Sequence, residues 1–263
     1  DDYIVKPFDP AELLAKVRVY LRLKSVEEVD RLKSNLLALL SHETRTPLTL
    51  ILGPTSLLLD SADLPARHRD LVSVVDSGAR RLVSLLDRVS FLSQLNMGEI
   101  AFRIGPEDLA AIARGAIGRA ERSSAEAGVR VTLDGESPAL VEGDAAHLGR
   151  VLDDLLDNAI RFSPSGGTVR VRIAASESGH RLTVSDSGPG VHPDLLPRLF
   201  QEFAVADVDH HTHGHGLGLA TARLIAERHA GTLELEPDAA SGGATFRLDL
   251  PSRDARPRQA VAP

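Results

Sequence analysis

The sequence predicts a multidomain chain in which an all-α helical hairpin precedes an α+β two-layer sandwich. Two observations indicate the hairpin. No glycine or proline interrupts residues 12–46, and a later segment has small or apolar residues in strict 4–3 alternation. That series consists of Leu71, Val75, Gly78, Leu82, Leu85, Val89 and Leu92. A third observation indicates the sandwich, because segments with strand periodicity alternate with helical ones after Gly98.

Two helices of this kind present more apolar surface than one hairpin can bury. We therefore expect a homodimer in which two hairpins form a four-helix bundle. The first helix is predicted to run to about Leu59, and residues 60–65 form the turn. The dimerisation domain is predicted to span residues 25–97.

Composition narrows the functional classes. The 263 residues suffice for two small domains, and the net charge of −7 argues against a nucleic-acid partner. The absence of cysteine excludes disulfides and thiolate metal sites and fits the cytoplasmic location that we expect. No apolar run approaches the roughly 20 residues of a membrane span, so we expect no membrane contact. Because the chain begins with Asp1 in mid-pattern, we interpret it as a fragment of something longer.

The first residues predict a strand, a turn and a helix start. Asp9, Pro10 and Glu12 have the cap, first-turn proline and N3 carboxylate of a helix N-terminus. Residues 1–24 are similar to the last strand, Lys-Pro turn and final helix of a response-regulator receiver domain. The resemblance implies a receiver remnant and linker helix that lacks the phosphorylatable aspartate. The alternative is a helix with an ordinary lead-in.

Residues 98–251 are predicted to form the sandwich, and residues 252–263 a disordered polar tail. The expected strands cover residues 101–104, 129–133, 139–142, 168–175, 180–186, 232–236 and 244–250. The expected helices cover residues 108–127 and 144–162, a short stretch around 193–203, and a segment ending at residue 230.

One motif in the first helix carries nucleophile chemistry. In His42-Glu43, a carboxylate stands next to an imidazole, where it can orient the ring and take its proton. Residues 41–48 closely resemble the phospho-acceptor box of sensor histidine kinases, and only Thr44 replaces a usual apolar residue. The resemblance implies phosphorylation of His42. Thr46 completes an E-x-x-T pattern like that of bifunctional members, in which the hydroxyl helps to dephosphorylate a partner receiver; a purely local role is the alternative.

The second half holds four motifs, each ambiguous by itself. Asp154, Asn158 and Arg161 share one helix face that suits a hard cation and phosphates, or is simply solvated. The other three motifs are glycine-rich. They are Asp186 with Gly188 and Gly190, then Gly214, Gly216 and Gly218 before a helix, and finally residues 242–246, which include Thr245.

The order and spacing of these motifs resemble the N box and glycine boxes of the GHKL (Bergerat) ATP-binding fold. Phe200 and Phe203 resemble its F box. The resemblance implies that ATP binds at these motifs, with Mg²⁺ on Asn158, the adenine amine on Asp186 and phosphate on Arg161. The glycines and Thr245 would complete the nucleotide site, and residues 204–215 would form its lid.

Three departures from the family pattern stand out. Asp154 replaces a usual asparagine, Val205 replaces a usual arginine, and residues 229–231 read His-Ala-Gly instead of His-Gly-Gly. The lid contains no lysine or arginine. Its potential cations are His210, His211, His213 and His215. These histidines could titrate with bound ATP, bind a transition metal, or be merely solvated.

The resemblance thus implies the core of a sensor histidine kinase, of hybrid type if the receiver resemblance holds. It would phosphorylate His42 from ATP and pass the phosphate to an aspartate of a receiver domain. The departures in the lid leave a second interpretation, a degenerate nucleotide-binding scaffold that dimerises but has little kinase activity. A GHKL chaperone or mismatch-repair ATPase is a third, but such proteins need no box like that around His42.

Overall fold

The computed structural model describes residues 43–135, 137–177, 179–204, 216–236 and 242–252. The chain forms two compact units, Asp1–Glu99 and Ile100–Pro263, which we call the hairpin unit and the sandwich unit. The predicted receiver remnant, His42, the lid residues 205–215 and most of the predicted tail lie outside the described residues. Among the helices that are described, none is long and apolar enough to cross a membrane.

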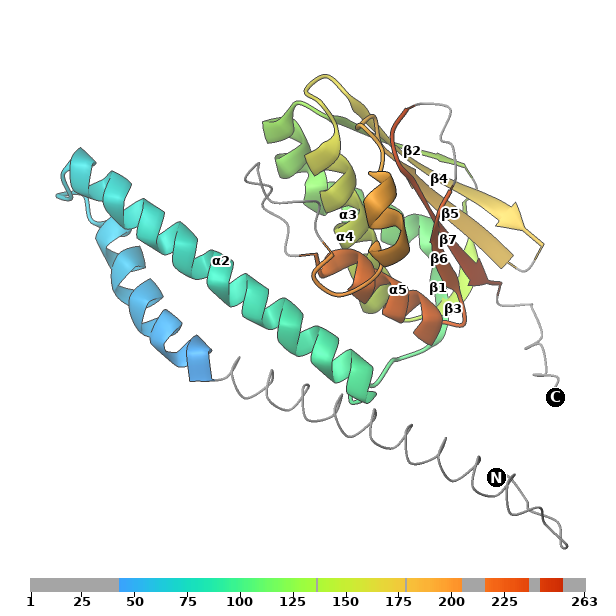
Figure 1. Ribbon diagram of the computed structural model, residues 1–263, viewed down its shortest axis with the longest axis horizontal. Coiled ribbons are helices and arrows are strands. Elements are labelled where there is room, and N and C mark those ends of the chain that lie inside the picture. Colours follow the sequence, from blue (N-terminus) through green and yellow to red (C-terminus); the bar gives the residue numbers. More distant parts are fainter. Residues whose placement is uncertain (1–42, 136, 178, 205–215, 237–241, 253–263) are drawn as a thin grey trace, which may run out of the picture. The chain divides into compact units, whose positions relative to one another are not determined.

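In the hairpin unit, residues 43–60 are helical and α2 spans Ala66–Met97 (Figure 1). The turn between them confirms the break predicted at residues 60–65. Arg69 stabilises this turn by donating to the carbonyl oxygens of Leu59 and Ser61. The helix α2 ends at Gly98, whose φ of 71° is the left-handed conformation that glycine adopts readily.

The face that joins the two helices differs from the series that the sequence singles out. In α2, Asp76 and Ala79 are buried, whereas Leu71, Val75 and Leu82 of the 4–3 series are between 50% and 59% exposed. These three members of the predicted apolar series therefore lie on a second face of α2, away from Asp76, whereas Leu92 of the same series is buried.

The sandwich unit is a five-stranded sheet with three helices on one face and a separate two-stranded sheet (Figure 1). Its elements are β1 (Gly105–Asp108), α3 (Leu109–Ala127), β2 (Arg130–Gly135), β3 (Leu140–Gly143), α4 (Ala145–Phe162), β4 (Thr168–Ser176), β5 (Gly179–Ser185), η1 (Pro193–Arg198), α5 (Gly218–Arg228), β6 (Thr232–Leu235) and β7 (Thr245–Pro251). The large sheet has the order β2-β4-β5-β7-β6, and only β2 and β4 are parallel. The predicted helical hairpin and α+β sandwich are confirmed.

Alternation along the strands explains the two layers. Val169, Val171 and Ile173 of β4 are buried, and the residues between them are exposed or half-buried. The strands β5 and β7 follow the same rule through Leu182, Val184 and Leu248. One face of the sheet thus forms the core with α3, α4 and α5, as a period of two residues dictates.

Three predicted boundaries are wrong for identifiable reasons. The strand expected at residues 101–104 lies at Gly105–Asp108, because the N–H of Arg103 donates to the carboxylate of Asp144 instead of a strand. The helix expected around residues 193–203 is a 3₁₀ helix that ends at Arg198, with Pro197 inside it. The helix α5 ends at Arg228, before Ala230, whose φ is 52°.

Asp144 joins three parts of the sandwich unit. It caps α4 by accepting from Ala146 N at 3.0 Å and His147 N at 3.1 Å, and it also accepts from Arg103 N at 2.8 Å. Burial by itself raises the pKa of Asp144, but the hydrogen bonds from the backbone of Arg103 and His147 outweigh it and lower the pKa to about 2.

His229 holds the backbone of Asp144 from the end of α5. Its Nε2 accepts from Asp144 N at 2.9 Å, and its Nδ1 lies 2.7 Å from Ile225 O. Because Nε2 accepts and Nδ1 must donate, the ring is neutral. Burial lowers the pKa of His229, and Phe102 packs edge-on against the ring at 5.3 Å.

We predict that protonation of His229 destabilises the sandwich unit. Its folded-state pKa lies below the usual 6.5, so the unfolded chain binds the proton more readily. The stabilisation is therefore complete above about pH 6.5 and is lost as the pH falls toward the folded-state pKa. Urea unfolding of the full chain at about pH 5 and about pH 7.5 measures this loss.

His229→Gln should flatten the pH dependence, because glutamine offers an acceptor that does not titrate in this range. His192→Gln is the control, since His192 is exposed on the approach to η1. An identical pH dependence in wild type and His229→Gln would contradict the assignment.

Candidate functional site

The described parts of the four motifs meet around the end of α4, the loop after β5, the start of β7 and the start of α5. A methyl group on Gly188 would lie 2.6 Å from Phe162 O, and one on Gly243 would lie 2.0 Å from Asp186 O. A methyl group on Gly218 would lie 3.3 Å from Asp154 Oδ1. The fold thus brings segments about 90 residues apart into one site, and glycine is needed where backbones approach.

Asp186 is the best-defined acid of this site. It follows β5, is buried, and accepts at Oδ1 from Gly188 N at 2.8 Å and from Ala244 N at 3.0 Å. Its own N–H donates to Ala244 O at 2.9 Å. Its Oδ2 takes no hydrogen bond from any residue described in the structure. The carboxylate is therefore fixed through one oxygen and can present the other to a ligand donor.

Serines that sequence reasoning missed hold the loop after Asp186. Ser187 Oγ donates to Thr168 O at 2.7 Å and accepts from Thr168 N at 3.1 Å. The N–H of Ser187 donates to Ser163 Oγ at 3.3 Å. The signal in the sequence was weak, because a serine in a glycine-rich turn and a serine after a helix are both common.

The remaining residues of this loop and of β7 support Asp186. Gly190 has a φ of 77°, a backbone conformation that residues other than glycine rarely adopt. The Oγ1 of Thr245 donates to Ser185 Oγ at 2.9 Å across the β5–β7 pair, immediately before Asp186 in the chain. Thr245 is buried, so its hydroxyl fixes the strand pair that carries the acid.

On α4, the three residues of the first motif differ in their surroundings. Asp154 is buried beside Gly218, at the N-terminal end of α5, while Asn158 and Arg161 are half-buried one and two turns later. Arg161 forms an ion pair with Asp157 and lies 5.9 Å above the ring of Phe162. To reach a phosphate, Arg161 would have to exchange this partner.

The third motif is described only from Gly216, and Gly214 lies outside the described residues. Gly216 has a φ of 65°, and a methyl group on it would lie 2.7 Å from the carbonyl carbon of Phe203. Phe203 is half exposed, with a φ of 60°. Phe200 is held by two neighbours. Its ring centroid lies 6.4 Å from that of Phe246, edge to face, and 5.2 Å from the guanidinium carbon of Arg223. Gly216 therefore brings the start of α5 against the end of the F-box segment.

The described residues of this site could hold a divalent cation only together with ligand oxygens. Within the described ranges, no group of three or more His, Asp or Glu side chains is arranged to hold a metal ion. Asn158 offers a single amide oxygen, and Mg²⁺ is typically bound by one or two protein ligands plus substrate phosphates and water. The donor set therefore fits Mg²⁺ that arrives with a polyphosphate.

In the hairpin unit, Glu43 and Thr46 are exposed one turn apart on the helix 43–60. Between them, Arg45 forms an ion pair with Asp87 of α2 at 2.5 Å. His42, the predicted nucleophile, lies outside the described residues. The exposed pair Glu43 and Thr46 is thus accessible to another protein surface.

Two family patterns match this chain. Residues 32–98 match the His Kinase A (phospho-acceptor) domain. Residues 143–254 match the histidine kinase-, DNA gyrase B- and HSP90-like ATPase domain.

Individual proteins are similar over most of the chain. The sensor protein DivL of Caulobacter vibrioides is 33% identical over 231 residues, which are 88% of this chain and 29% of DivL. The full-length ShkA structure in complex with AMPPNP is 30% identical, with a TM-score of 0.70 over 82% of this chain and 45% of ShkA. The mycobacterial sensor histidine kinase MprB structure is 31% identical, with a TM-score of 0.50 over 57% of this chain and 99% of that chain. The chain therefore spans less than half of DivL and ShkA.

We predict that Asp186→Asn weakens adenine-nucleotide binding and leaves the fold intact. The amide oxygen can replace Oδ1 as acceptor for Gly188 and Ala244, so the amide NH₂ then occupies the Oδ2 position. The NH₂ group at that position would then face the amine of the adenine, which is also a donor, and the two cannot form a hydrogen bond. The loss of a charge-assisted hydrogen bond should weaken the binding free energy by about 1–2 kcal/mol, which raises the dissociation constant roughly 5- to 30-fold.

Isothermal titration with an ATP analogue measures this change, and Asp134→Asn, at an exposed position near the end of β2, is the control. A dissociation constant that does not change in Asp186→Asn would place the adenine elsewhere.

Proposed function

This chain belongs to the histidine kinase family, and on that premise we propose that it is the dimerisation and catalytic core of a two-component sensor histidine kinase. It transfers the γ-phosphoryl group of ATP to His42. The observation that carries the proposal is the carboxylate of Asp186, which is buried and fixed through Oδ1 while Oδ2 remains available. It stands where the N box and glycine boxes meet, on a chain that also has the acceptor motif His42-Glu43.

The proposed reaction is a phosphoryl transfer between two units of the chain. A ring nitrogen of His42 attacks the γ-phosphorus, the bond from that phosphorus to the bridging oxygen breaks, and ADP leaves. Glu43 orients the ring and takes its proton. Mg²⁺ held by Asn158 would neutralise charge on the phosphates. The protein contributes mostly positioning, because Asp186 fixes the nucleotide and the hairpin fixes the acceptor.

The division of labour follows the two compact units. The boundary between Glu99 and Ile100 supports a phosphotransfer domain over residues 25–97 and an ATP-binding domain over residues 98–251. We further propose that residues 1–24 are a receiver remnant and residues 252–263 a tail; the sequence supports both.

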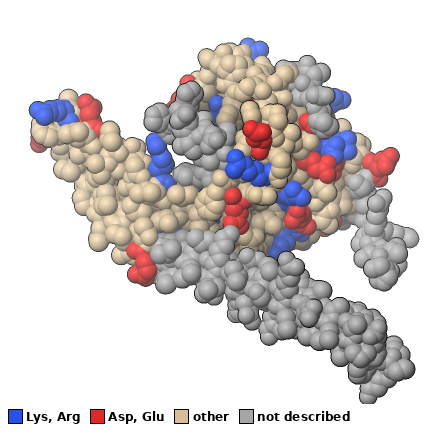
Figure 2. Space-filling model, viewed as in Figure 1, with Lys and Arg blue, Asp and Glu red and all other residues tan. Residues whose placement is uncertain are grey.

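Exposed apolar side chains on the hairpin unit support a homodimer. The large ones that are at least 42% exposed are Leu50, Ile51, Leu57, Leu58, Leu71, Val74, Val75 and Leu82. On the face of the hairpin in Figure 2, charged side chains are sparse between the turn and the opposite end. A second copy of the hairpin would cover this surface as a four-helix bundle.

We propose that the phosphate passes from His42 to an aspartate of a response-regulator receiver domain. The exposed pair Glu43 and Thr46 supports docking of such a partner next to the acceptor. The hydroxyl of Thr46 could also position water for removal of the phosphate from that receiver, which would make the protein bifunctional.

A degenerate scaffold with little kinase activity is the second candidate. Val205 and the absence of lysine and arginine from residues 204–215 favour it, because a lid normally supplies a permanent cation to the phosphates. Incubation of the wild-type protein with labelled ATP distinguishes the two, since a scaffold binds the nucleotide without acquiring label.

His42→Ala should abolish autophosphorylation and leave the affinity for ATP nearly unchanged, because acceptor and nucleotide belong to different compact units. Acid-labile label on the full chain measures the first effect and titration with an ATP analogue the second. His68→Ala, at an exposed position of α2, is the control. Label that persists on His42→Ala would show that the acceptor is another residue.

Thr46→Ala should slow dephosphorylation of a phosphorylated receiver by roughly tenfold or more and spare autophosphorylation, because the hydroxyl acts on water and not on ATP. The measurement follows the decay of labelled receiver in the presence of the kinase. If both activities fall together, the substitution has damaged the helix and Thr46 has no such role.

A further inference from the structure

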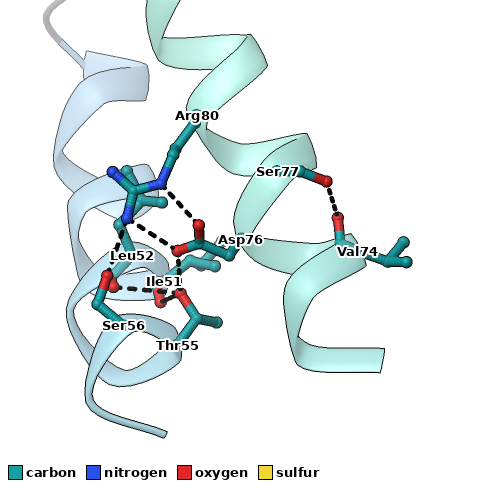
Figure 3. Close-up of polar contacts among 8 residues, drawn as sticks. All are labelled: Ile51, Leu52, Thr55, Ser56, Val74, Asp76, Ser77 and Arg80. Carbon is teal, nitrogen blue, oxygen red and sulfur yellow. Dashed lines mark hydrogen bonds and ion pairs between the residues drawn. The ribbon is translucent and has the colours of Figure 1, made fainter. Parts of the chain in front are cut away.

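The contact within the hairpin contains a polar cluster in which Thr55 and Asp76 are buried and the Arg80 side chain is 61% exposed (Figure 3). Thr55 of the helix 43–60 and Asp76 of α2 are both 8% exposed, and Thr55 Oγ1 lies 3.0 Å from Asp76 Oδ1. Arg80, one turn after Asp76, donates from Nε to Asp76 Oδ2 at 2.6 Å. It also donates from Nη2 to Ser56 Oγ at 3.0 Å and so returns to the first helix.

The hydroxyl of Thr55 has a choice of acceptors. Besides Asp76, the carbonyl oxygens of Ile51 and Leu52 lie 3.0 and 3.1 Å from Oγ1, but a hydroxyl donates one proton. A carboxylate is the strongest of these acceptors. The hydrogen bond from Arg80 lowers the pKa of Asp76 against the opposing effect of burial, and Thr55 lowers it further. The cluster is thus a charge-assisted contact between the two helices.

A carboxylate in this place is not the most stabilising choice. Most other buried residues of the two helices are apolar, among them Leu48 and Ala79. Replacing a buried polar or ionic pair by apolar side chains of similar volume is often neutral or stabilising, because desolvation offsets much of the attraction. The cluster must therefore be explained by something other than stability.

The sequence of the contact face provides the explanation. Residues that share the face of Thr55 at helical spacing are Leu48, Leu52 and Leu59, so Thr55 is the polar member of a leucine row. If one helix slid by a turn, Asp76 would lie opposite a leucine and lose the hydrogen bond from Thr55, while Arg80 of its own helix would stay with it. Leucine rows by themselves tolerate such a slip, whereas a single buried polar pair fixes one register.

We propose that Thr55, Asp76 and Arg80 form a register lock, a set of positioning residues that fixes the height of the acceptor helix against α2. The inference rests on the proposed function, because the helix that is fixed begins next to His42. Glu43 lies about 18 Å from Thr55 along a straight helix, and a one-turn slip would move it by about 5.4 Å. In-line transfer needs the reacting atoms about 3–3.5 Å apart, so a slip of that size prevents it.

Between the described parts of the two helices, other polar contacts are less selective. The ion pair of Arg45 and Asp87 joins side chains that are 46% and 54% exposed, so solvent and salt screen it. Arg69 contacts backbone carbonyls at the turn, which every register provides. Of these three contacts between residues 43–60 and α2, the buried pair is therefore the one that distinguishes one register from the next.

The test uses the full chain with the double substitution Thr55→Val and Asp76→Leu. We expect the rate constant of autophosphorylation to fall at least tenfold with the KM for ATP unchanged, since ATP binds in the other unit. We expect the thermal midpoint of the hairpin unit to stay the same or rise. Asp76→Asn, which keeps an acceptor for Thr55, should recover most of the rate.

Thr49→Val is the matched control. Thr49 also donates to the carbonyl of the residue four positions earlier, Arg45, at 2.9 Å, but it is exposed and this hydrogen bond stays within its own helix. Its rate and stability should match wild type. Equal losses of rate and stability in the double variant would reduce the cluster to an ordinary stabilising contact and overturn the proposal, as would an unchanged rate.

A second readout does not depend on kinase activity. The chain has no cysteine, so Gly53→Cys and Ser84→Cys, both at exposed positions, accept two spin labels. In chains diluted with unlabelled protein, the pair reports the distance between the two helices. The wild-type background should give one narrow distance and the double variant a broadened or shifted one. An identical distribution refutes the lock, and a wild-type chain without autophosphorylation refutes the proposed function alone.

Discussion

The sandwich unit depends on the contact between Asp144 and His229. The carboxylate of Asp144 caps α4 and holds the N–H of Arg103, while its own N–H donates to His229 at the end of α5. One residue thus connects the entry segment, the helix with the N box and the helix after the second glycine box. The contact requires an ionised carboxylate and a neutral imidazole, and the environment favours both forms, because the pKa of each group is lowered.

Backbone hydrogen bonds also position the carboxylate at the proposed adenine site. Asp186 uses Oδ1 to join the loop after β5 to the start of β7, so the acid is positioned by backbone amides and not by a flexible partner. Backbone hydrogen bonds and close glycine contacts form the surroundings before any ligand arrives. Such preorganisation reduces the entropy cost of binding, because the loop and the side chain are already ordered before the ligand binds.

The hairpin unit follows a different principle. Its apolar side chains lie largely at the surface, where a second copy can cover them, and its internal contact includes the charged group of Asp76. We interpret this as a separation of tasks, in which dimerisation provides stability and the cluster of Thr55, Asp76 and Arg80 provides register. A bundle built from leucine rows alone would be stable but less precise in alignment.

The sequence by itself determined the order and type of nearly all described elements and the identity of Asp186 and its glycines, because periodicity and backbone needs are local properties. Only the tertiary structure decided which face of α2 meets the first helix. The spacing of Asp76 and Ala79 is as compatible with one helix face as the spacing of the 4–3 series is with another. It also decided that the N–H of Arg103 donates to Asp144 and not to a neighbouring strand. Likewise it decided that His229 accepts a hydrogen bond from Asp144 and is not exposed to solvent. The last two outcomes depend on residues 41 and 85 positions away, which a local pattern does not contain.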